Sequence, residues 1–254
     1  MSDSSGKARA WGRQSFWALL ALLALLGVSL ACGCQAERPA LVGDDLSVAL
    51  PETLDEAALV RRPPARGSTA PRVALLLHGS GSSPRMFLDV ADEISRQGFV
   101  ALVVRGPRVL GPDRYSWSSD EETHALLGRI VELAGREMPI SRKRPILVGY
   151  SLGATLAVHL LAQHPDVYAS AFAISPGPLA STHLPPTSLS RPLVILVGSE
   201  DGPSEQAVAG IAQAWAAAKE PLWVVHHPGD HRPPDDWRDR FDDAMTWVTV
   251  KADS

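Results

Sequence analysis

The sequence has few cysteines and no excess of basic residues. Its 254 residues include only two cysteines, Cys32 and Cys34, which lie too close together to staple a fold. No CxxC pair and no Cys/His spacing predicts a zinc site. The formal net charge is −4, which argues against a nucleic-acid partner because such proteins usually carry a basic surface. The composition, with 45% hydrophobic and 20% charged residues, allows one domain with a sizeable core.

One long apolar run occurs, at residues 16–31, after a polar start that carries Lys7, Arg9 and Arg13. A basic start, an apolar stretch and small residues at its end are typical of an export signal. The run is slightly short for a bilayer span of ~20 residues, and an uncleaved anchor helix is the alternative. We therefore expect residues 1–35 to lie outside the fold and to be the only part that associates with a membrane.

The two cysteines refine this expectation, because the segment resembles a bacterial lipoprotein signal, in which a cysteine becomes the lipidated first residue. The place three residues before each cysteine, usually aliphatic, holds Ser29 for Cys32 and Ala31 for Cys34. The sequence thus predicts export to the bacterial envelope or periplasm. A lipid anchor on Cys32 or Cys34 and secretion without an anchor are the two alternatives.

The rest of the chain divides into a linker and one folded domain. Residues 36–71 are rich in Pro, Ala and Arg, and we expect a linker with an edge strand at Leu46–Leu50 and a second weak element at Leu54–Val60. From residue 72 to 254, short apolar runs alternate with stretches of helical periodicity. The runs are 73–77, 99–104, 145–149, 168–174, 193–197 and 221–225, and the helical stretches are 86–97, 121–137, 152–163, 204–219 and 235–250.

This alternation predicts an α/β fold. Apolar runs of five to seven residues suit strands that are buried on both faces. Strands that alternate with helices imply a mostly parallel sheet with helices on both faces. The segment between Ala173 and Leu193 is short and rich in proline, which leaves no room for a large cap domain.

The motif Gly149-Tyr-Ser-Leu-Gly153 joins one of these strands to a helix. A nucleophile elbow needs a tight turn of this kind, with small residues two places before and after the serine. We therefore predict Ser151 as a nucleophile. The turn also directs the backbone N–H of Leu152 and the helix N-terminus toward a reacting oxygen.

A glycine-rich loop, His78-Gly-Ser-Gly-Ser-Ser83, follows the first strong strand. Without side chains in the way, its backbone amides can face a cavity and act as oxyanion donors. The N–H of Ser80 is the first candidate and that of Gly81 the second. No G-x-x-x-x-G-K-[ST] motif is present to indicate a phosphate site. We expect His78 to orient the loop rather than to react.

A serine nucleophile needs a base that a carboxylate orients. Asp201 follows the strand at residues 193–197, with Glu200 and Glu205 as rivals and a solvated Asp-Gly turn as the alternative reading. The carboxyl end of the last strand brings three histidines. His231 lies on a loop that can reach the elbow and is favoured over His227 and His226.

A metal site is a competing interpretation of this histidine cluster, with Asp230, Asp235 and Asp236 as further ligands. Adjacent histidines at a strand end point to opposite faces and cannot easily hold one ion. We therefore predict neither a metal nor a cofactor.

These motifs, in this order, resemble the α/β-hydrolase superfamily over about residues 72–250. The closest resemblance is to the small phospholipase/carboxylesterase group, related to dienelactone hydrolases, because Val104-Arg-Gly-Pro107 and Tyr115-Ser-Trp117 are similar to a segment of that group. The resemblance implies that Trp117 and Tyr150 help line a substrate pocket. A capping role for Trp117 at the next helix is the alternative, because the residues after it depart from the group's pattern.

The expected activity is hydrolysis of carboxylic esters, or of thioesters, by a Ser151-Asp201-His231 triad through an acyl-enzyme. The substrate would be a small-molecule or surface-presented acyl compound in an open cleft. A serine peptidase or amidase is one alternative. Another is a noncatalytic envelope-anchored binding protein on a hydrolase scaffold, which would be expected to have lost a triad residue or an oxyanion loop. The sequence leaves the oligomeric state open.

Overall fold

The structure is a computed structural model that describes residues 50–64, 69–178, 189–234 and 236–252. The predicted export signal and residues 46–49 of the edge strand predicted at Leu46–Leu50 lie outside the described residues, and Leu50 itself is not in a strand. All described residues belong to one unit, Ser47–Ser254. Within the described ranges, no helix combines the length and the apolar character that crossing a bilayer requires.

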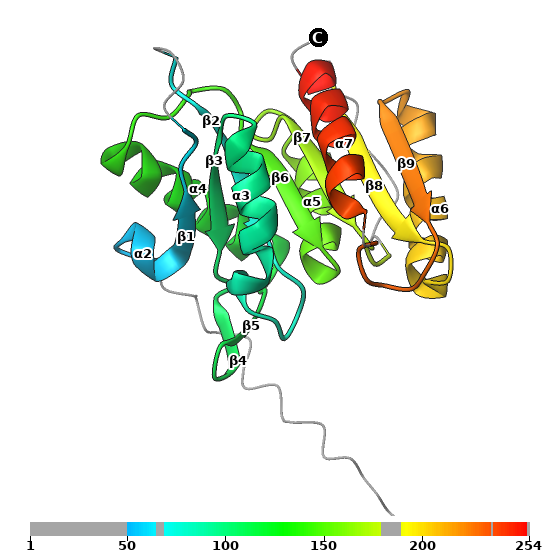
Figure 1. The fold of residues 1–254 in the computed structure, drawn as a ribbon, viewed down its shortest axis with the longest axis horizontal. Coiled ribbons are helices and arrows are strands. Elements are labelled where there is room, and N and C mark those ends of the chain that lie inside the picture. Colours follow the sequence, from blue (N-terminus) through cyan, green and yellow to red (C-terminus); the bar gives the residue numbers. More distant parts are fainter. Residues whose placement is uncertain (1–49, 65–68, 179–188, 235, 253–254) are drawn as a thin grey trace, which may run out of the picture. The chain divides into compact units, whose positions relative to one another are not determined.

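The described residues form one seven-stranded sheet with the strand order β1-β3-β2-β6-β7-β8-β9 (Figure 1). Only β1 runs antiparallel to its neighbour, β3, and the other five pairings are parallel. The mostly parallel sheet predicted from the sequence is therefore confirmed. The strands are β1 (Ala58–Arg61), β2 (Arg72–Leu77), β3 (Phe99–Val104), β6 (Ile146–Tyr150), β7 (Ser170–Ile174), β8 (Leu193–Gly198) and β9 (Leu222–His227).

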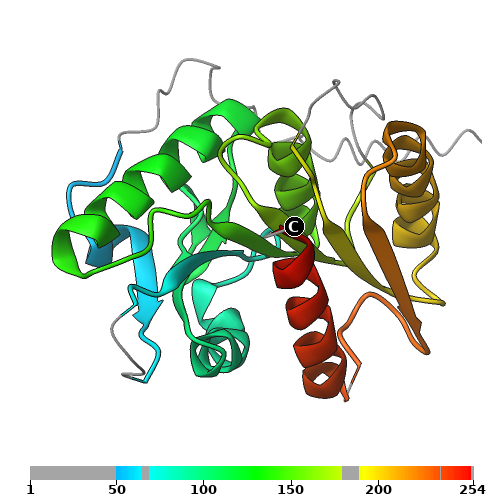
Figure 2. The same ribbon diagram turned by 90° about the horizontal axis from the view of Figure 1, so that it is seen from above.

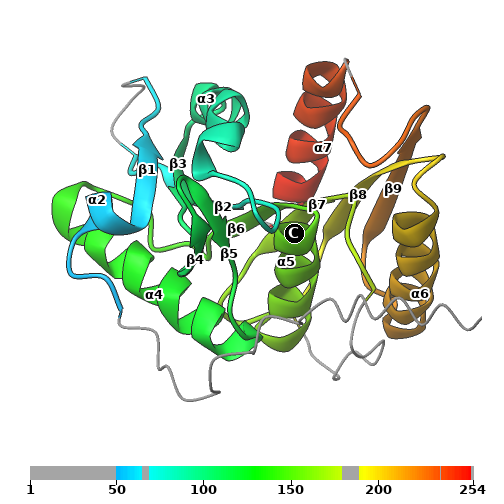
Figure 3. The same ribbon diagram turned by 90° about the horizontal axis from the view of Figure 1, so that it is seen from below.

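Helices cover both faces of this sheet, which is why the central strands are continuously apolar. Figures 2 and 3 show α4, α5 and α6 on one face and α3 and α7 on the other. Successive strand residues serve different faces: Leu75 and Leu77 pack in the layer with α4, α5 and α6, whereas Leu76 packs in the layer with α3 and α7. The helices are α2 (Leu54–Ala57), α3 (Leu88–Arg96), α4 (Asp120–Glu137), α5 (Leu152–Gln163), α6 (Gly202–Ala218) and α7 (Trp237–Ala252), with the 3₁₀ helix η1 (Pro84–Phe87) before α3.

Local signals in the sequence define the ends of several helices. Ser119 and Glu122 form a capping box at the start of α4, in which each side chain binds the other residue's backbone N–H. Asp201 caps the start of α6, and Lys219, the residue after the end of this helix, adopts the left-handed conformation, with φ of 58°. Such caps supply partners for helix-end groups that the helix itself leaves unpaired.

Two elements differ from the sequence prediction. The weak element expected at Leu54–Val60 is the short helix α2 followed by the edge strand β1. A hairpin, β4 (Arg108–Gly111) and β5 (Arg114–Ser116), was not predicted, because its residues are largely exposed and lack the apolar pattern of buried strands. Figure 1 shows the hairpin beyond the carboxyl ends of the central strands. Over that edge, the described residues form no cap domain.

Candidate active site

Ser151 occupies a strained turn between β6 and α5. Its backbone angles are φ 55° and ψ −121°, a combination that non-glycine residues rarely adopt. The turn is held from both sides, because Ser151 N–H donates to Ile174 O at 2.9 Å and Thr155 N–H donates to Ser151 O at 3.0 Å. The surrounding fold thus holds the serine at the carboxyl edge of the sheet in a backbone conformation that is unfavourable for a non-glycine residue.

The glycines of the motif are required by close packing around this turn. A β-carbon on Gly149 would lie 2.2 Å from the carbonyl oxygen of Gly153, and one on Gly153 would lie 2.1 Å from Leu77 O. Both distances are far below van der Waals contact. The G-x-S-x-G spacing is therefore a steric condition for bringing α5 against β2 and β6.

His231 contacts Asp201 directly. The Nδ1 of His231 lies 2.7 Å from Oδ2 of Asp201, and because the carboxylate can only accept, the imidazole donates this hydrogen bond. Burial alone would raise the pKa of Asp201, but hydrogen bonds from Ser204 and His231 outweigh it and hold the pKa below its ordinary value. The carboxylate is therefore charged near neutral pH. Because the imidazole donates to it from Nδ1, Nε2 of His231 is the ring nitrogen left to act as a base.

The rival residues have other partners. His227 is buried, and its Nδ1 lies 2.9 Å from the carbonyl oxygen of Pro228. Nε2 of His226 lies 3.2 Å from Oε1 of Glu205. Glu200 enters the described hydrogen bonds only through its backbone N–H, which donates to Gly229 O at 2.8 Å.

The glycine-rich loop lies against the elbow. A β-carbon on Gly79 would lie 3.2 Å from Cδ1 of Tyr150 and 3.3 Å from Cβ of Ser151. The N–H of Gly81 donates to Tyr115 O at 2.8 Å and is therefore occupied. The N–H of Ser80 has no partner among the described residues. Of the two predicted donors in this loop, only Ser80 is thus available to an oxyanion.

His78 holds the base of this loop. Gly106 N–H donates to its Nε2 at 3.0 Å, so the proton lies on Nδ1, which donates to Gly79 O at 2.8 Å. Burial lowers the pKa of His78 and keeps the ring neutral. Trp117 donates through Nε1 to His78 O at 2.7 Å and packs on the ring at 4.9 Å between centroids. Trp117 is 2% exposed, and its contacts with His78 support the loop.

One open cavity of about 570 Å³ contains Ser151, Asp201 and His231. Its other lining residues come from α5, α6 and the carboxyl end of β7; they are Leu152, Thr155, Ser175, Gly177, Pro178, Pro203 and Ser204. Neither Trp117 nor Tyr150 lines it, although the Tyr150 ring lies 5.3 Å from that of His231. The Ser151 hydroxyl makes no hydrogen bond with the described residues, so proton transfer to His231 requires a closer approach of the two side chains.

The structure also reveals positioning residues that the sequence analysis missed. Ser175, with φ of 50°, donates from Oγ to His231 O at 3.2 Å and fixes the histidine loop. Ser204 N–H lies 3.4 Å from Oδ1 of Asp201, and Thr155 Oγ1 accepts the N–H of Gly177 at 2.7 Å. Ser175 follows a strand at the carboxyl edge of the sheet, and this position was the only feature of the sequence that indicated a role for it at the site.

Within the described part of the chain, no three His, Cys, Asp or Glu side chains are grouped to hold a metal ion.

Comparison with known proteins identifies the family of this chain. A profile described as the alpha/beta hydrolase family matches residues 74–253, and the chain belongs to that family. The fold and the superfamily inferred from the sequence motifs are thereby confirmed. No protein with a curated function shows significant similarity to the sequence.

Solved structures with the same fold include several esterases. A carboxylesterase from Mesorhizobium loti is 21% identical, with a TM-score of 0.58, over 71% of this chain and 90% of that one. The Bacillus cereus carboxylesterase is 18% identical, with a TM-score of 0.60, over 76% and 93%. A monoacylglycerol lipase from Paleococcus ferrophilus is 16% identical, with a TM-score of 0.54, over 77% and 98%. At these identities the likeness concerns the fold.

Proposed function

We propose that the protein is a serine esterase that hydrolyses carboxylic esters, or the related thioesters, through an acyl-enzyme on Ser151. The observation that carries this proposal is the 2.7 Å bond between His231 and the low-pKa carboxylate of Asp201, in the same cavity as a serine on a strained elbow. The small phospholipase/carboxylesterase resemblance and the esterases that share the fold support it.

In the proposed reaction, Nε2 of His231 takes the proton of Ser151 as Oγ attacks the ester carbonyl. Asp201 holds the imidazole through Nδ1 and stabilises its charged form. The same imidazole then donates the proton to the leaving alcohol. Water, activated by His231, releases the acid from Ser151 and regenerates the hydroxyl.

The oxyanion of each tetrahedral intermediate would be bound by the backbone N–H groups of Leu152 and Ser80. Leu152 is the first residue of α5, and its N–H has no partner within the helix. The loss of one such donor costs ~3 kcal/mol of transition-state stabilisation in well-studied hydrolases. The hydrogen bonds that hold the Ser80 loop in place therefore bear directly on the rate.

The test is to label the full chain and a Ser151→Ala variant with a fluorophosphonate probe and to assay both with short p-nitrophenyl esters. We expect the wild-type protein to be labelled and to turn over esters, and the variant to do neither. His231→Gln should also lose turnover, and Asp201→Asn should retain only a small fraction of the wild-type turnover. A folded wild-type protein that is not labelled would exclude the esterase and favour the noncatalytic binding protein.

We also propose that residues 1–35 direct export. Mass spectrometry of the protein purified from a bacterial host should find a mature chain that begins near residue 35, or a lipidated chain that begins at Cys32 or Cys34. A chain with its original N-terminus would instead indicate the uncleaved anchor.

A further inference from the structure

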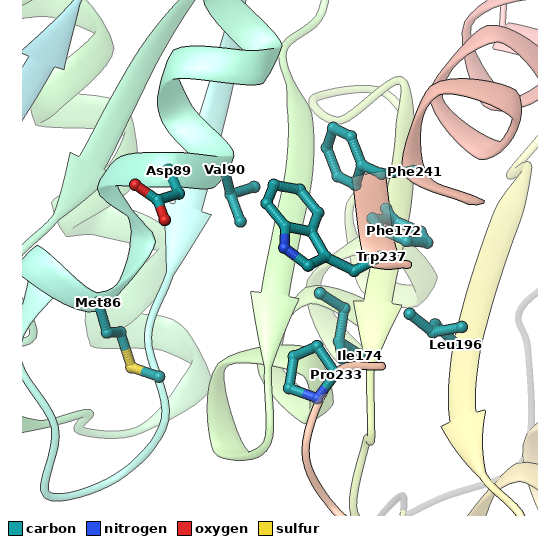
Figure 4. Close-up of a pocket in the computed structure, with 9 residues that line it drawn as sticks. All are labelled: Met86, Asp89, Val90, Phe172, Ile174, Leu196, Pro233, Trp237 and Phe241. Carbon is teal, nitrogen blue, oxygen red and sulfur yellow. The ribbon is translucent and has the colours of Figure 1, made fainter. Parts of the chain in front are cut away.

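A second cavity, of about 140 Å³, lies on the sheet face that α3 and α7 cover. Its lining is apolar apart from Asp89; the residues are Met86, Asp89, Val90, Phe172, Ile174, Leu196, Pro233, Trp237 and Phe241. Figure 4 shows the Trp237 ring at the centre, between Val90 and Phe241, with Ile174 and Pro233 below it. The Asp89 carboxylate is 77% exposed and faces Arg238 at 3.8 Å, so no buried charge opposes an apolar occupant.

Several residues that line this cavity follow, along the chain, the glycine-rich loop and the loop that carries His231. Met86 and Val90 follow the glycine-rich loop by a few residues, and Pro233 is two residues after His231. The floor includes Ile174, whose carbonyl oxygen accepts the N–H of Ser151 at 2.9 Å. Three separate segments therefore contribute residues both to the candidate active site and to the cavity.

Tyr150 connects the two regions. Its ring lies against the position of Gly79 on one side and 5.3 Å from the His231 ring on the other. It also packs against the apolar cluster that contains Phe172, Ile174 and Phe241. Tyr150 thus lies between the candidate active site and the apolar cluster that supplies part of the cavity lining.

We propose that this cavity binds a benzene-sized apolar group of the substrate, so that the preferred esters carry one aromatic or branched apolar group of about six carbons. This inference rests on the proposed esterase function. Its physical basis is that an engineered apolar cavity of ~150 Å³, lined by similar aliphatic and aromatic side chains, binds benzene. Burial of such a group removes apolar surface from water and contributes to binding.

Such a group could belong to the acyl part or to the alcohol part of the ester. Two isomeric substrates distinguish these sources: methyl phenylacetate carries the ring on the acyl side, and benzyl acetate carries it on the alcohol side. Ethyl acetate, which has no ring, is the reference for each. We expect one isomer to exceed the reference in kcat/KM by at least about tenfold, the range typical of an apolar specificity pocket.

Val90→Phe should fill the cavity from α3 and lower kcat/KM for the preferred isomer to about that for ethyl acetate. The matched control is Val131→Phe, which makes the same change at a partly buried valine of α4, packed against the layer on the other sheet face. Fluorophosphonate labelling of both variants reports whether the nucleophile is intact. A labelled Val90→Phe variant that keeps the wild-type preference would overturn the inference and leave the esterase function standing.

Two further measurements keep the inference testable if Val90→Phe does not fold. Trp237→Ala enlarges the cavity and should raise kcat/KM for the naphthyl analogue of the preferred isomer. In a Ser151→Ala background, saturation-transfer NMR should detect binding of the preferred aromatic ester and weaker binding of ethyl acetate. Equal binding of the two esters, or no gain from Trp237→Ala, would count against an occupant of this kind.

Discussion

At the scale of single residues, the candidate site combines groups with opposite effects on folding. Asp201 binds His231 with one carboxylate oxygen and the first turn of α6 with the other, so its proposed chemical role and its role as a cap coincide. Ser151 has no such benefit, because its φ of 55° and ψ of −121° lie in a region where a β-carbon is strained. The nucleophile therefore costs stability that the surrounding hydrogen bonds must offset.

Ser151→Gly should for this reason stabilise the protein, by about 1 kcal/mol after the larger backbone entropy of glycine in the unfolded chain is subtracted. Urea denaturation of wild type, Ser151→Gly and Ser151→Ala measures this effect. Alanine keeps the β-carbon and should leave the free energy of unfolding close to the wild-type value. If glycine and alanine have the same effect, the strain at this turn is negligible.

His78 should make stability depend on pH. Its folded pKa lies below the ordinary value of ~6.5, so the unfolded chain takes up more protons as the pH falls below that value. The contribution of His78 is therefore complete above ~6.5 and is lost as the pH falls toward the folded value. Relative to His78→Asn, wild type should have a larger advantage in unfolding free energy at about pH 7.5 than at about pH 5.5. An advantage independent of pH would contradict the neutral, buried imidazole.

At the scale of elements, the site depends on supports outside the sheet. The β4–β5 hairpin holds the glycine-rich loop by the bond from Gly81 N–H to Tyr115 O, by a 3.1 Å bond from Arg114 Nε to Gly81 O and by the Ser80–Ser116 hydroxyl contact at 2.9 Å. Sequence reasoning identified the loop but not the hairpin. Short polar strands that pair only with each other have no periodic signal to distinguish them from a surface loop.

A buried ion pair joins the segments just before β8 and β9. The Arg191 side chain, 1% exposed, donates to Glu220 at 2.9 and 3.1 Å, and Arg191 N–H donates to the same carboxylate at 2.8 Å. Glu220→Ala should lower the free energy of unfolding by about 3–5 kcal/mol, because it removes a carboxylate that accepts from a buried guanidinium. Glu132→Ala, at an exposed side chain of α4, is the control and should change it little. A similar small effect of both variants would show that water replaces the carboxylate.

At the scale of the whole molecule, the alternation of apolar runs and helical stretches predicted the sheet, the helices on both faces and the order of the motifs. It also predicted the residues that meet in one cavity, because Ser151, Asp201 and His231 each follow a parallel strand and such ends share an edge. It could not predict the cavity beside α7. That cavity depends on how Trp237 and Val90 pack across elements far apart in the sequence, which periodicity does not encode.

Both layers of the core share one sheet, so they should unfold together. Trp215 lies in the layer with α4, α5 and α6, whereas Trp223 and Trp247 pack, 6.0 Å apart, against the other. Fluorescence of Trp215→Phe and of Trp247→Phe weights opposite layers. Each variant should show a single urea transition whose midpoint agrees with its own far-UV circular dichroism. Separate midpoints for fluorescence and circular dichroism would indicate layers that fold independently.

The contrast between Asp201 and Ser151 bears on how descendants of this protein would diverge. A lineage released from selection for activity would still benefit from the aspartate, because it caps α6, and would gain from replacing the serine with glycine. Retention of the aspartate in a relative thus carries little information about catalysis. Retention of the serine, against its conformational cost, is the stronger record of selection for chemistry.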